Sequence, residues 1–181
     1  MAYQSMRDWI AKLEKEGLLK RITTEVDWNL ELGAITRRVA DQQGPALLFE
    51  NIKGYQSTPC RRLFAGGLGS RERLALALGL PGESGYRQII EFMKQRLEKR
   101  LDPVKVASGP VKENIISGDA VNLYDFPAPM WNHLDGGRYI NTYATQVTMD
   151  PDTKIMNLGI YRGMIGDDEK SIPVLLSKSQ H

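Results

Sequence analysis

The sequence predicts an α/β protein of the α+β kind, in which an N-terminal mixed α/β domain is followed by antiparallel strands. Three observations support this prediction. Apolar residues recur at helical spacing in four segments before residue 100, and short apolar runs bounded by turn residues separate these segments. Beyond residue 130, apolar, aromatic and threonine residues surround a Pro-Asp turn, which is typical of a hairpin.

The first predicted helix starts at Met6, where apolar residues begin to recur at helical spacing. Ser5 is its predicted N-cap, and Gly17 is the residue at which it stops. Residues 19–26 then predict an edge strand, and residues 30–41 return to helical spacing. This alternation of helix and strand is the first sign of the mixed fold.

A short apolar run at residues 46–52 follows a Gly-Pro break and predicts a buried strand. Another strand is expected at residues 62–65. The glycine-rich segment 66–70 then leads into a predicted helix at residues 71–78. A fourth, strongly amphipathic helix is expected at residues 86–99, and the proline that follows ends it.

Residues 102–131 predict a connection with an intermittent extended strand, because four prolines are spread among short β-like pieces. We place the domain boundary near Val106. The prediction is therefore an N-terminal α/β domain over residues 1–105 and a second, β-rich domain over residues 106–181.

The β-rich part predicts a hairpin whose strands are residues 138–149 and 154–162. The turn at 150–153 has proline at its second position, as a type I turn favours. A third strand is expected at residues 173–177. An apolar strand so near the end of the sequence would present an unpaired edge, which favours a piece of a longer protein.

Composition excludes several classes of protein. A single cysteine rules out a disulfide framework within the chain, and one cysteine with only two histidines cannot supply the ligands of a classical zinc ribbon or finger. The 24 basic and 22 acidic residues nearly cancel, so bulk charge gives no case for nucleic-acid binding. Apolar runs reach only four or five residues, far below the ~20 that span a bilayer. We expect a cytoplasmic protein that binds neither nucleic acid nor membranes.

Arg162 is the most informative candidate for ligand binding. A strand over residues 157–162 would place it on the same face as Leu158 and Ile160. An arginine among apolar neighbours needs an anionic partner, and carboxylates and phosphates fit its planar fork. A structural ion pair at the rim of a site is the alternative, and both interpretations stay open at this point.

Other candidates have weaker support. The turn at residues 66–70 could bind an anion, but a strand-to-helix turn capped by Ser70 is the favoured interpretation. Basic residues in segment 86–99 are interrupted by glutamates and favour a solvated face. His133 could act as an acid or a base, although the residues after it favour a simple turn. Asn157 and His181 could share a hard cation, yet two ligands make an incomplete site.

Three segments together resemble the UbiD family of reversible decarboxylases. Residues 135–143 read Asp-Gly-Gly-Arg-Tyr-Ile-Asn-Thr-Tyr, residues 157–162 read Asn-Leu-Gly-Ile-Tyr-Arg, and residues 179–181 read Ser-Gln-His. Residues 44–55 and 67–73 are similar to that family's N-terminal domain. The resemblance therefore covers essentially the whole chain.

The resemblance implies a fold and a set of site residues. The N-terminal α/β domain would precede the first strands of a split β-barrel that binds prenylated FMN. Asn157 and His181 would ligate a divalent metal, usually Mn²⁺, that bridges to the cofactor phosphate, with K⁺ as an optional companion ion. The cofactor would be lined by Ile160, Tyr161, Arg162 and Gln180, and Arg162 would also act catalytically on the substrate carboxylate, within a network of one arginine and two acids.

The resemblance also implies partners. The substrate would be an aromatic or α,β-unsaturated carboxylic acid, a flavin prenyltransferase would supply the cofactor, and the protein would form a homo-oligomer. The family's metal-binding glutamate and catalytic acids lie C-terminal to these residues, so we expect this chain alone to be inactive. It would be part of a longer protein or a naturally short homologue.

Two other classes remain alternatives. A non-catalytic subunit or assembly domain would use the N-terminal α/β part to dock on a larger carboxylase. A flavin reductase on a similar split barrel is less favoured, because the sequence has no nicotinamide-binding signature.

Overall fold

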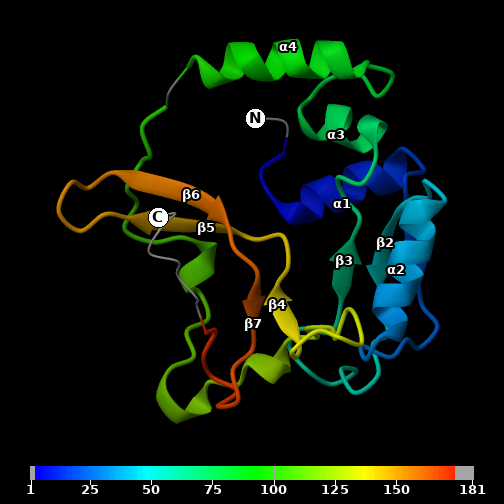
Figure 1. Cartoon of the computed structure of the whole chain (residues 1–181), viewed down its shortest axis with the longest axis vertical. Helices are drawn as coiled ribbons and strands as arrows, with labels where there is room; N and C mark the ends of the chain where they lie inside the picture. Colours follow the sequence, from blue (N-terminus) through cyan, green and yellow to red (C-terminus); the bar gives the residue numbers. More distant parts are fainter. Residues whose placement is uncertain (1–2, 100, 174–181) are drawn as a thin grey trace. The chain divides into compact units, whose positions relative to one another are not determined.

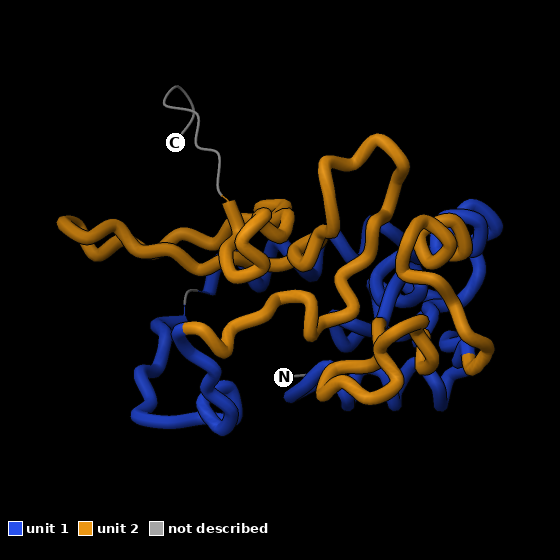
Figure 2. Tube along the Cα trace, turned by 90° about the horizontal axis from the view of Figure 1, so that it is seen from below, with its two compact units in different colours: residues 1–22, 36–48, 64–118 blue, residues 23–35, 49–63, 119–181 orange. Residues whose placement is uncertain are grey.

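The computed structural model describes residues 3–99 and 101–173. Two compact units are each assembled from separate stretches of chain (Figure 2). Unit 1 contains residues 1–22, 36–48 and 64–118, and unit 2 contains residues 23–35, 49–63 and 119–181. These units group residues by spatial contact, and the domain boundary near Val106 is a division along the sequence that stays a prediction.

Helix α1 (Met6–Lys15) opens unit 1 with the predicted signals at both ends. The Ser5 side chain accepts a hydrogen bond from the backbone N–H of Asp8 at 3.2 Å. Gly17 has a φ of +71°, a conformation that glycine adopts at little cost, and ends the helix. The buried face of α1 places Trp9 and Leu13 against Ala46, which forms a small core.

Strands β1 (Leu19–Ile22), β2 (Ala46–Phe49) and β3 (Leu63–Ala65) form a sheet in the order β1-β2-β3. Figure 1 labels β2 and β3 of this sheet. The central strand β2 is fully buried, as its uninterrupted apolar sequence predicts. β1 is an edge strand, as expected, but it ends at Ile22. Further along, Val26 makes only an isolated parallel bridge with Ile52.

Three further helices follow the predicted periodicity: α2 (Glu31–Asp41), α3 (Arg71–Ala77) and α4 (Tyr86–Leu97). The Ser70 side chain accepts a hydrogen bond from the backbone N–H of Arg73 at 3.2 Å, which confirms the capped turn. The buried Arg73 donates from Nη1 to the carbonyl of Gly44 at 2.9 Å. The glycine-rich segment before α3 therefore has a structural role.

The expected extended strand in the connection is wrong for most of its length. Three 3₁₀ turns occupy it instead: η1 (Pro110–Lys112), η2 (Gly118–Ala120) and η3 (Leu123–Asp125). Only Met130 pairs there, through an isolated parallel bridge with Asn29 within unit 2. The prolines explain this, because each lacks the N–H that a strand ladder needs.

The described part of unit 2 also contains four strands in two antiparallel pairs. β4 (Tyr139–Asn141) pairs with β7 (Gly163–Met164), and β5 (Thr145–Met149) pairs with β6 (Met156–Ile160). The predicted hairpin is confirmed in β5 and β6, which lie side by side in Figure 1. The single strand expected at 138–149 is divided, because its two halves pair with different partners.

One part of the predicted β region differs from expectation, and another cannot be compared with the structure. β6 ends at Ile160, so Arg162 lies in the link to β7 and not in a strand with Leu158. Most of the third predicted strand, at residues 173–177, lies outside the described residues.

Candidate functional site

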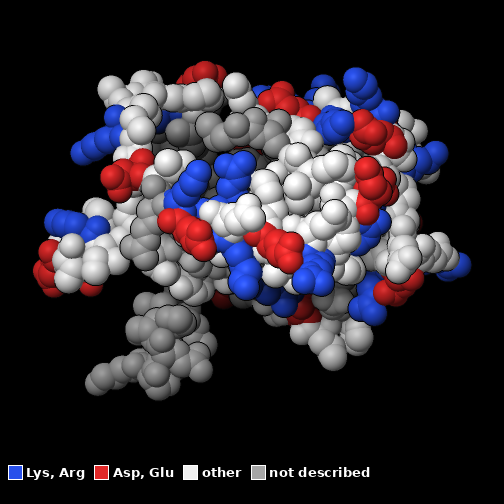
Figure 3. Space-filling model, turned by 90° about the horizontal axis from the view of Figure 1, so that it is seen from above, with Lys and Arg blue, Asp and Glu red and all other residues white. Residues whose placement is uncertain are grey.

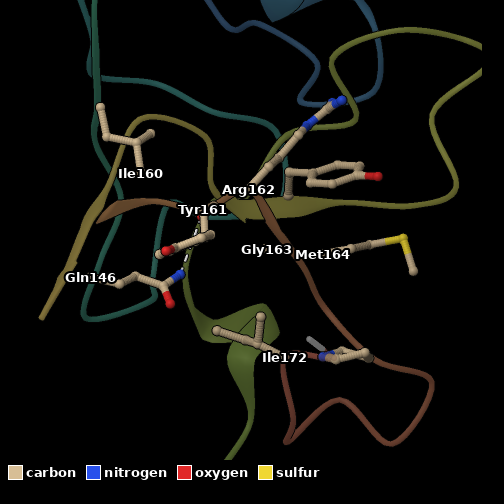
Figure 4. A pocket seen from close by; sticks show the side chains of 9 residues that line it. Gln146, Ile160, Tyr161, Arg162, Gly163, Met164 and Ile172 are labelled. Carbon is tan, nitrogen blue, oxygen red and sulfur yellow. Dashed lines mark hydrogen bonds between the residues drawn. The ribbon is translucent and has the colours of Figure 1, made fainter. Parts of the chain in front are cut away.

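A hollow of about 400 Å³ lies in unit 2, within the size range of small-molecule sites. Much of its wall is built by the consecutive residues 160–164, which run from the end of β6 through the link into β7 (Figure 4). It is lined by Tyr139, Gln146, Ile160, Tyr161, Arg162, Gly163, Met164, Ile172 and Pro173. The structure thus brings the predicted residues Ile160, Tyr161 and Arg162 together around one cavity.

The β5–β6 register explains how Tyr161 is held. Asn157 and Gly159 share one face of the hairpin with Gln146, because Gln146 lies opposite Gly159. Gln146 Nε2 donates to the backbone carbonyl of Tyr161 at 3.2 Å, a bond drawn in Figure 4. Asn157 Nδ2 lies 3.5 Å from the Tyr161 hydroxyl. These contacts fix the tyrosine at the end of the hairpin.

Gly159 is required where the Tyr161 ring crosses the strand. A Cβ added at Gly159 would lie 2.3 Å from Cε2 of that ring, closer than any real contact. No side chain can therefore occupy position 159 while Tyr161 keeps its place. The shape of this wall depends on the glycine of the Asn-Leu-Gly-Ile-Tyr-Arg sequence.

Arg162 has two partners among the described residues. Its Nη2 donates to Oδ2 of Asp135 at 2.8 Å, and its guanidinium carbon lies 3.7 Å from the centroid of the Tyr139 ring. The Arg162 side chain remains 47% exposed, whereas that of Asp135 is only 10% exposed. Arg162 thus forms the structural ion pair that the sequence left open as the alternative to ligand binding.

The pKa of Asp135 lies below its usual range. Desolvation alone would raise this pKa, but the hydrogen bond and charge of Arg162 outweigh it, with further help from Asn132. Backbone N–H and side-chain Nδ2 of Asn132 lie 3.1 Å and 3.4 Å from Asp135 Oδ2. The carboxylate therefore stays ionised at neutral pH and keeps its attraction for Arg162.

The turn after Asp135 packs closely on the cavity wall. A Cβ at Gly136 or Gly137 would lie 3.2 Å or 3.0 Å from the sulfur of Met164, a lining residue. The turn was expected from the Asp-Gly-Gly sequence, and its contact with Met164 explains why small residues are needed there.

Arg138 is enclosed by aromatic rings of unit 2. Its guanidinium carbon lies 4.0 Å, 4.6 Å and 5.6 Å from the ring centroids of Trp28, Tyr124 and Tyr55. Nε donates to the carbonyl of Ala128 at 2.6 Å, and Nη2 donates to the Tyr55 hydroxyl. Because Arg138 directly precedes β4, these contacts anchor the strand that carries Tyr139.

The predicted metal ligands can be examined only in part. The exposed Asn157 lies near the Tyr161 hydroxyl, whereas His181 and Gln180 fall outside the described residues. Within residues 3–99 and 101–173, no group of three or more His, Cys, Asp or Glu side chains could hold a metal ion. Of the two predicted metal ligands, only Asn157 lies within the described residues, and its role stays a prediction.

Surface charge is mixed on the face of the molecule shown in Figure 3, where acidic and basic side chains alternate. His133 is exposed in the segment before β4. None of the helices in the described residues has the length and apolar content that a membrane crossing requires.

Sequence reasoning missed three side chains that define the site: Asp135, Tyr139 and Gln146. A partial signal existed for Asp135, because an arginine expected among apolar residues needs an anion nearby, but no pattern pointed to this particular aspartate. Tyr139 and Gln146 gave no such signal, since their role depends on how β4, β5 and the β6–β7 link meet.

Two family profiles match consecutive parts of the chain. The profile of the 3-octaprenyl-4-hydroxybenzoate carboxy-lyase N-terminal domain matches residues 10–93. The profile of the Rift-related domain of the same carboxy-lyase matches residues 102–181. Together they cover nearly the whole chain.

Two curated relatives are similar in sequence. Pyrrole-2-carboxylic acid decarboxylase of Pseudomonas aeruginosa is 38% identical over 169 residues, which cover 89% of this chain and 34% of the relative. Ferulic acid decarboxylase 1 of Saccharomyces cerevisiae is 38% identical over 188 residues, covering 97% of this chain and 36% of the relative. The chain spans about a third of the length of the curated relatives it matches.

Solved structures share the fold. An evolved dimeric form of the UbiD-class enzyme HmfF from Pelotomaculum thermopropionicum, in complex with prFMN, has a TM-score of 0.82 at 31% identity. The match covers 97% of this chain and 39% of that one. Vanillic acid decarboxylase of Sedimentibacter hydroxybenzoicus, in open form, has a TM-score of 0.80 at 33% identity, covering 92% of this chain and 36% of that one.

Proposed function

Because the chain belongs to the UbiD family of carboxy-lyases, we propose that it is the N-terminal part of a reversible decarboxylase that uses prenylated FMN and a divalent metal. The proposed substrates are aromatic or α,β-unsaturated carboxylic acids. Relatives named for pyrrole-2-carboxylic, ferulic and vanillic acid support this class.

The observation that carries the proposal is the position of Arg162. Arg162 lines a cavity of small-molecule size, its side chain is 47% exposed, and its guanidinium contacts Asp135 through Nη2. Guanidinium has five N–H donors, so the remaining ones can bind a carboxylate in the bidentate manner that arginine favours. In the proposed role, Arg162 orients the carboxylate of the acid and stabilises its charge as the bond to carbon breaks.

The residues of the cavity fit one side of a flavin site. Gly159 lets the Tyr161 ring lie against the hairpin, and both Tyr161 and Ile160 line the cavity. When bound, prenylated FMN supplies the electrophilic ring that makes decarboxylation of such acids feasible. Ile160, Tyr161 and Gln180 would contact this ring system and exclude water from it.

The metal site is a finer part of the proposal. Asn157 would supply an amide oxygen and His181 an imidazole nitrogen to Mn²⁺, which would bridge to the cofactor phosphate. K⁺ is the optional second ion. Because hard cations take six or more ligands, the remaining ones would come from the cofactor and from elsewhere in the whole protein.

Exposed apolar side chains support a larger whole protein. One face of the β5–β6 hairpin presents Val147, Leu158 and Ile160, which are 60%, 67% and 55% exposed. A two-stranded hairpin gains independent stability only when such a face is packed. We therefore expect this chain alone to be inactive, and the whole protein to act in the cytoplasm as a homo-oligomer supplied with cofactor by a flavin prenyltransferase.

The test is carbon dioxide release by the whole protein loaded with Mn²⁺ and either prenylated FMN or FMN. The probes are pyrrole-2-carboxylate, ferulate, vanillate and 3-octaprenyl-4-hydroxybenzoate. Release that requires prenylated FMN supports the proposal. Cofactor-loaded protein that releases none from a broad panel of aromatic and unsaturated acids would instead favour a non-catalytic subunit.

A further inference from the structure

The guanidinium of Arg162 is held from two directions by residues of one short segment. Asp135 accepts a hydrogen bond from Nη2 at 2.8 Å, and the Tyr139 ring lies 3.7 Å from the guanidinium carbon. In Figure 4 the guanidinium points away from the side chains of Gln146 and Ile172. A flexible arginine would sample many rotamers here, so these two contacts select one of them.

Asp135 is held in place by contacts other than its hydrogen bond with Arg162. The same oxygen, Oδ2, lies 3.1 Å from the backbone N–H of Asn132, which donates to it, and the side chain is only 10% exposed. The following glycines pack on Met164, which holds the turn against the cavity wall. The carboxylate is therefore a rigid acceptor. Because it is already ordered, less conformational entropy is lost when the ion pair with Arg162 forms.

Tyr139 is fixed from the opposite side of β4. Side chains of neighbouring residues in an extended segment point to opposite faces. Arg138 lies within 4.0 Å to 5.6 Å of three aromatic ring centroids and donates to the carbonyl of Ala128. The anchoring of Arg138 thus fixes the strand on which the Tyr139 ring supports Arg162.

We infer that Asp135 and Tyr139 are positioning residues for Arg162, which lines the cavity, and that they hold its guanidinium in one orientation in which its other N–H donors remain available to a carboxylate. This inference rests on the proposed function for the identity of the ligand. The contacts of Asp135 and Tyr139 with Arg162 lie within this chain and can be tested without cofactor or substrate.

The first experiment measures the side-chain nitrogen resonances of Arg162 by NMR in the whole protein without cofactor, with Arg162→Lys to identify them. In the native protein we expect restricted guanidinium rotation and a change in the Arg162 resonances as Asp135 is protonated in acid. Asp135→Asn should abolish both, Asp135→Glu should partly restore them, and Tyr139→Leu should increase guanidinium mobility. Asp119→Asn is the matched control, because Asp119 pairs with Lys170 on the surface of the same unit.

The second experiment measures kcat and KM in the whole protein loaded with prenylated FMN and Mn²⁺, with pyrrole-2-carboxylate as the first probe. Misplacing a reacting or orienting group by about 1 Å costs on the order of 100-fold in rate. We therefore expect Asp135→Asn to lower kcat by about 10- to 100-fold with unchanged cofactor content. Asp119→Asn should leave kcat unchanged.

Resonances of Arg162 that are the same in Asp135→Asn as in the native protein would overturn the inference, whatever the decarboxylation activity of either variant. A changed spectrum with unchanged kcat would also overturn it, because the contact would then serve stability alone. A native protein that carries the cofactor but decarboxylates none of the probes would count against the proposed function, while the spectrum would still decide the hold on Arg162.

Discussion

The guanidinium of Arg138 stacks on the indole of Trp28, with 4.0 Å between the guanidinium carbon and the ring centroid. This contact joins two residues 110 positions apart in the sequence, and both belong to unit 2. Unit 2 is thereby stabilised by a cation enclosed in aromatic rings at the start of β4. The same strand carries Tyr139, so the stability of unit 2 and the geometry of the site depend on one short segment.

Replacing Arg138 by methionine should destabilise unit 2. The change removes cation–π contacts worth about 0.5–2 kcal/mol and charge-assisted hydrogen bonds worth about 1.5–3 kcal/mol each. Because methionine keeps part of the packing, we expect a net loss of about 2–4 kcal/mol in urea denaturation. Arg138→Lys should recover only part of it, since lysine lacks the planar fork.

Arg37→Met is the control for this prediction. Arg37 pairs with Asp41 on an exposed helix face, where its side chain is 80% exposed. Such pairs contribute about 0.3–0.5 kcal/mol, so the control should unfold nearly as the native chain does. Equal losses of stability in both variants would show that the aromatic rings around Arg138 contribute nothing beyond an ordinary surface pair.

Gly33→Ala should destabilise the protein although alanine is the better helix former. An added Cβ at Gly33 would lie 2.5 Å from the carbonyl oxygen of Trp131, which is backbone and cannot move aside cheaply. We expect a loss of about 1–3 kcal/mol by urea denaturation, against a gain of about 1 kcal/mol from helix propensity alone. Gly109→Ala, with open space around the added atom, should change stability by less than about 0.5 kcal/mol. A stabilised Gly33→Ala variant would refute the close packing.

Gly159→Ala should displace the Tyr161 ring, because the added Cβ would lie 2.3 Å from it. We expect the NMR signals of the Tyr161 ring and of the Gln146 side-chain amide to shift. Resonances of α1 in unit 1 should stay in place. In the whole protein the same variant should bind prenylated FMN more weakly. An unperturbed Tyr161 ring would show that the wall of the cavity does not depend on this glycine.

Acid should weaken the contribution of Asp135 to stability. Its pKa is lower in the folded chain than in the unfolded one, so the unfolded state binds the proton first as the pH falls. The stabilisation is complete above the ordinary aspartate pKa of ~3.9 and is lost as the pH falls through the depressed folded value. Native chain and Asp135→Asn should therefore differ in urea midpoint at neutral pH and converge as the pH falls below the depressed folded pKa. A difference that stays constant with pH would contradict the ionised pair.

Local signals predicted much of the fold. Ser5 and Gly17 delimit α1, Ser70 caps α3, and the Pro-Asp turn closes the β5–β6 hairpin, as expected from side-chain capping and backbone preference. Each of these features depends on residues within a few positions of one another. Short-range physics is sufficient for them.

The assembly of each unit from separate stretches of chain could not be predicted in the same way. Unit 2 depends on pairings such as the bridge between Asn29 and Met130. No local sequence pattern predicts a bridge between residues so far apart in the chain. The site shows the same limit. Arg162 was recognised because its charge needs a partner, but Asp135 lies 27 positions away in a segment that reads as a turn. The roles of Gln180 and His181 stay predictions, since both lie outside the described residues.

The most direct test of the proposed reaction is isotope exchange in the whole protein loaded with prenylated FMN and Mn²⁺. Pyrrole-2-carboxylate, ferulate or vanillate is incubated with ¹³C-bicarbonate, and the label in the carboxyl group of the remaining acid is measured by mass spectrometry. A reversible decarboxylase that uses Arg162 should introduce the label, and Arg162→Met should reduce the exchange by at least about 100-fold, the loss typical of a removed charge-stabilising group. Absence of exchange and of carbon dioxide release with all the acids tested, or exchange that is undiminished in Arg162→Met, would contradict this account.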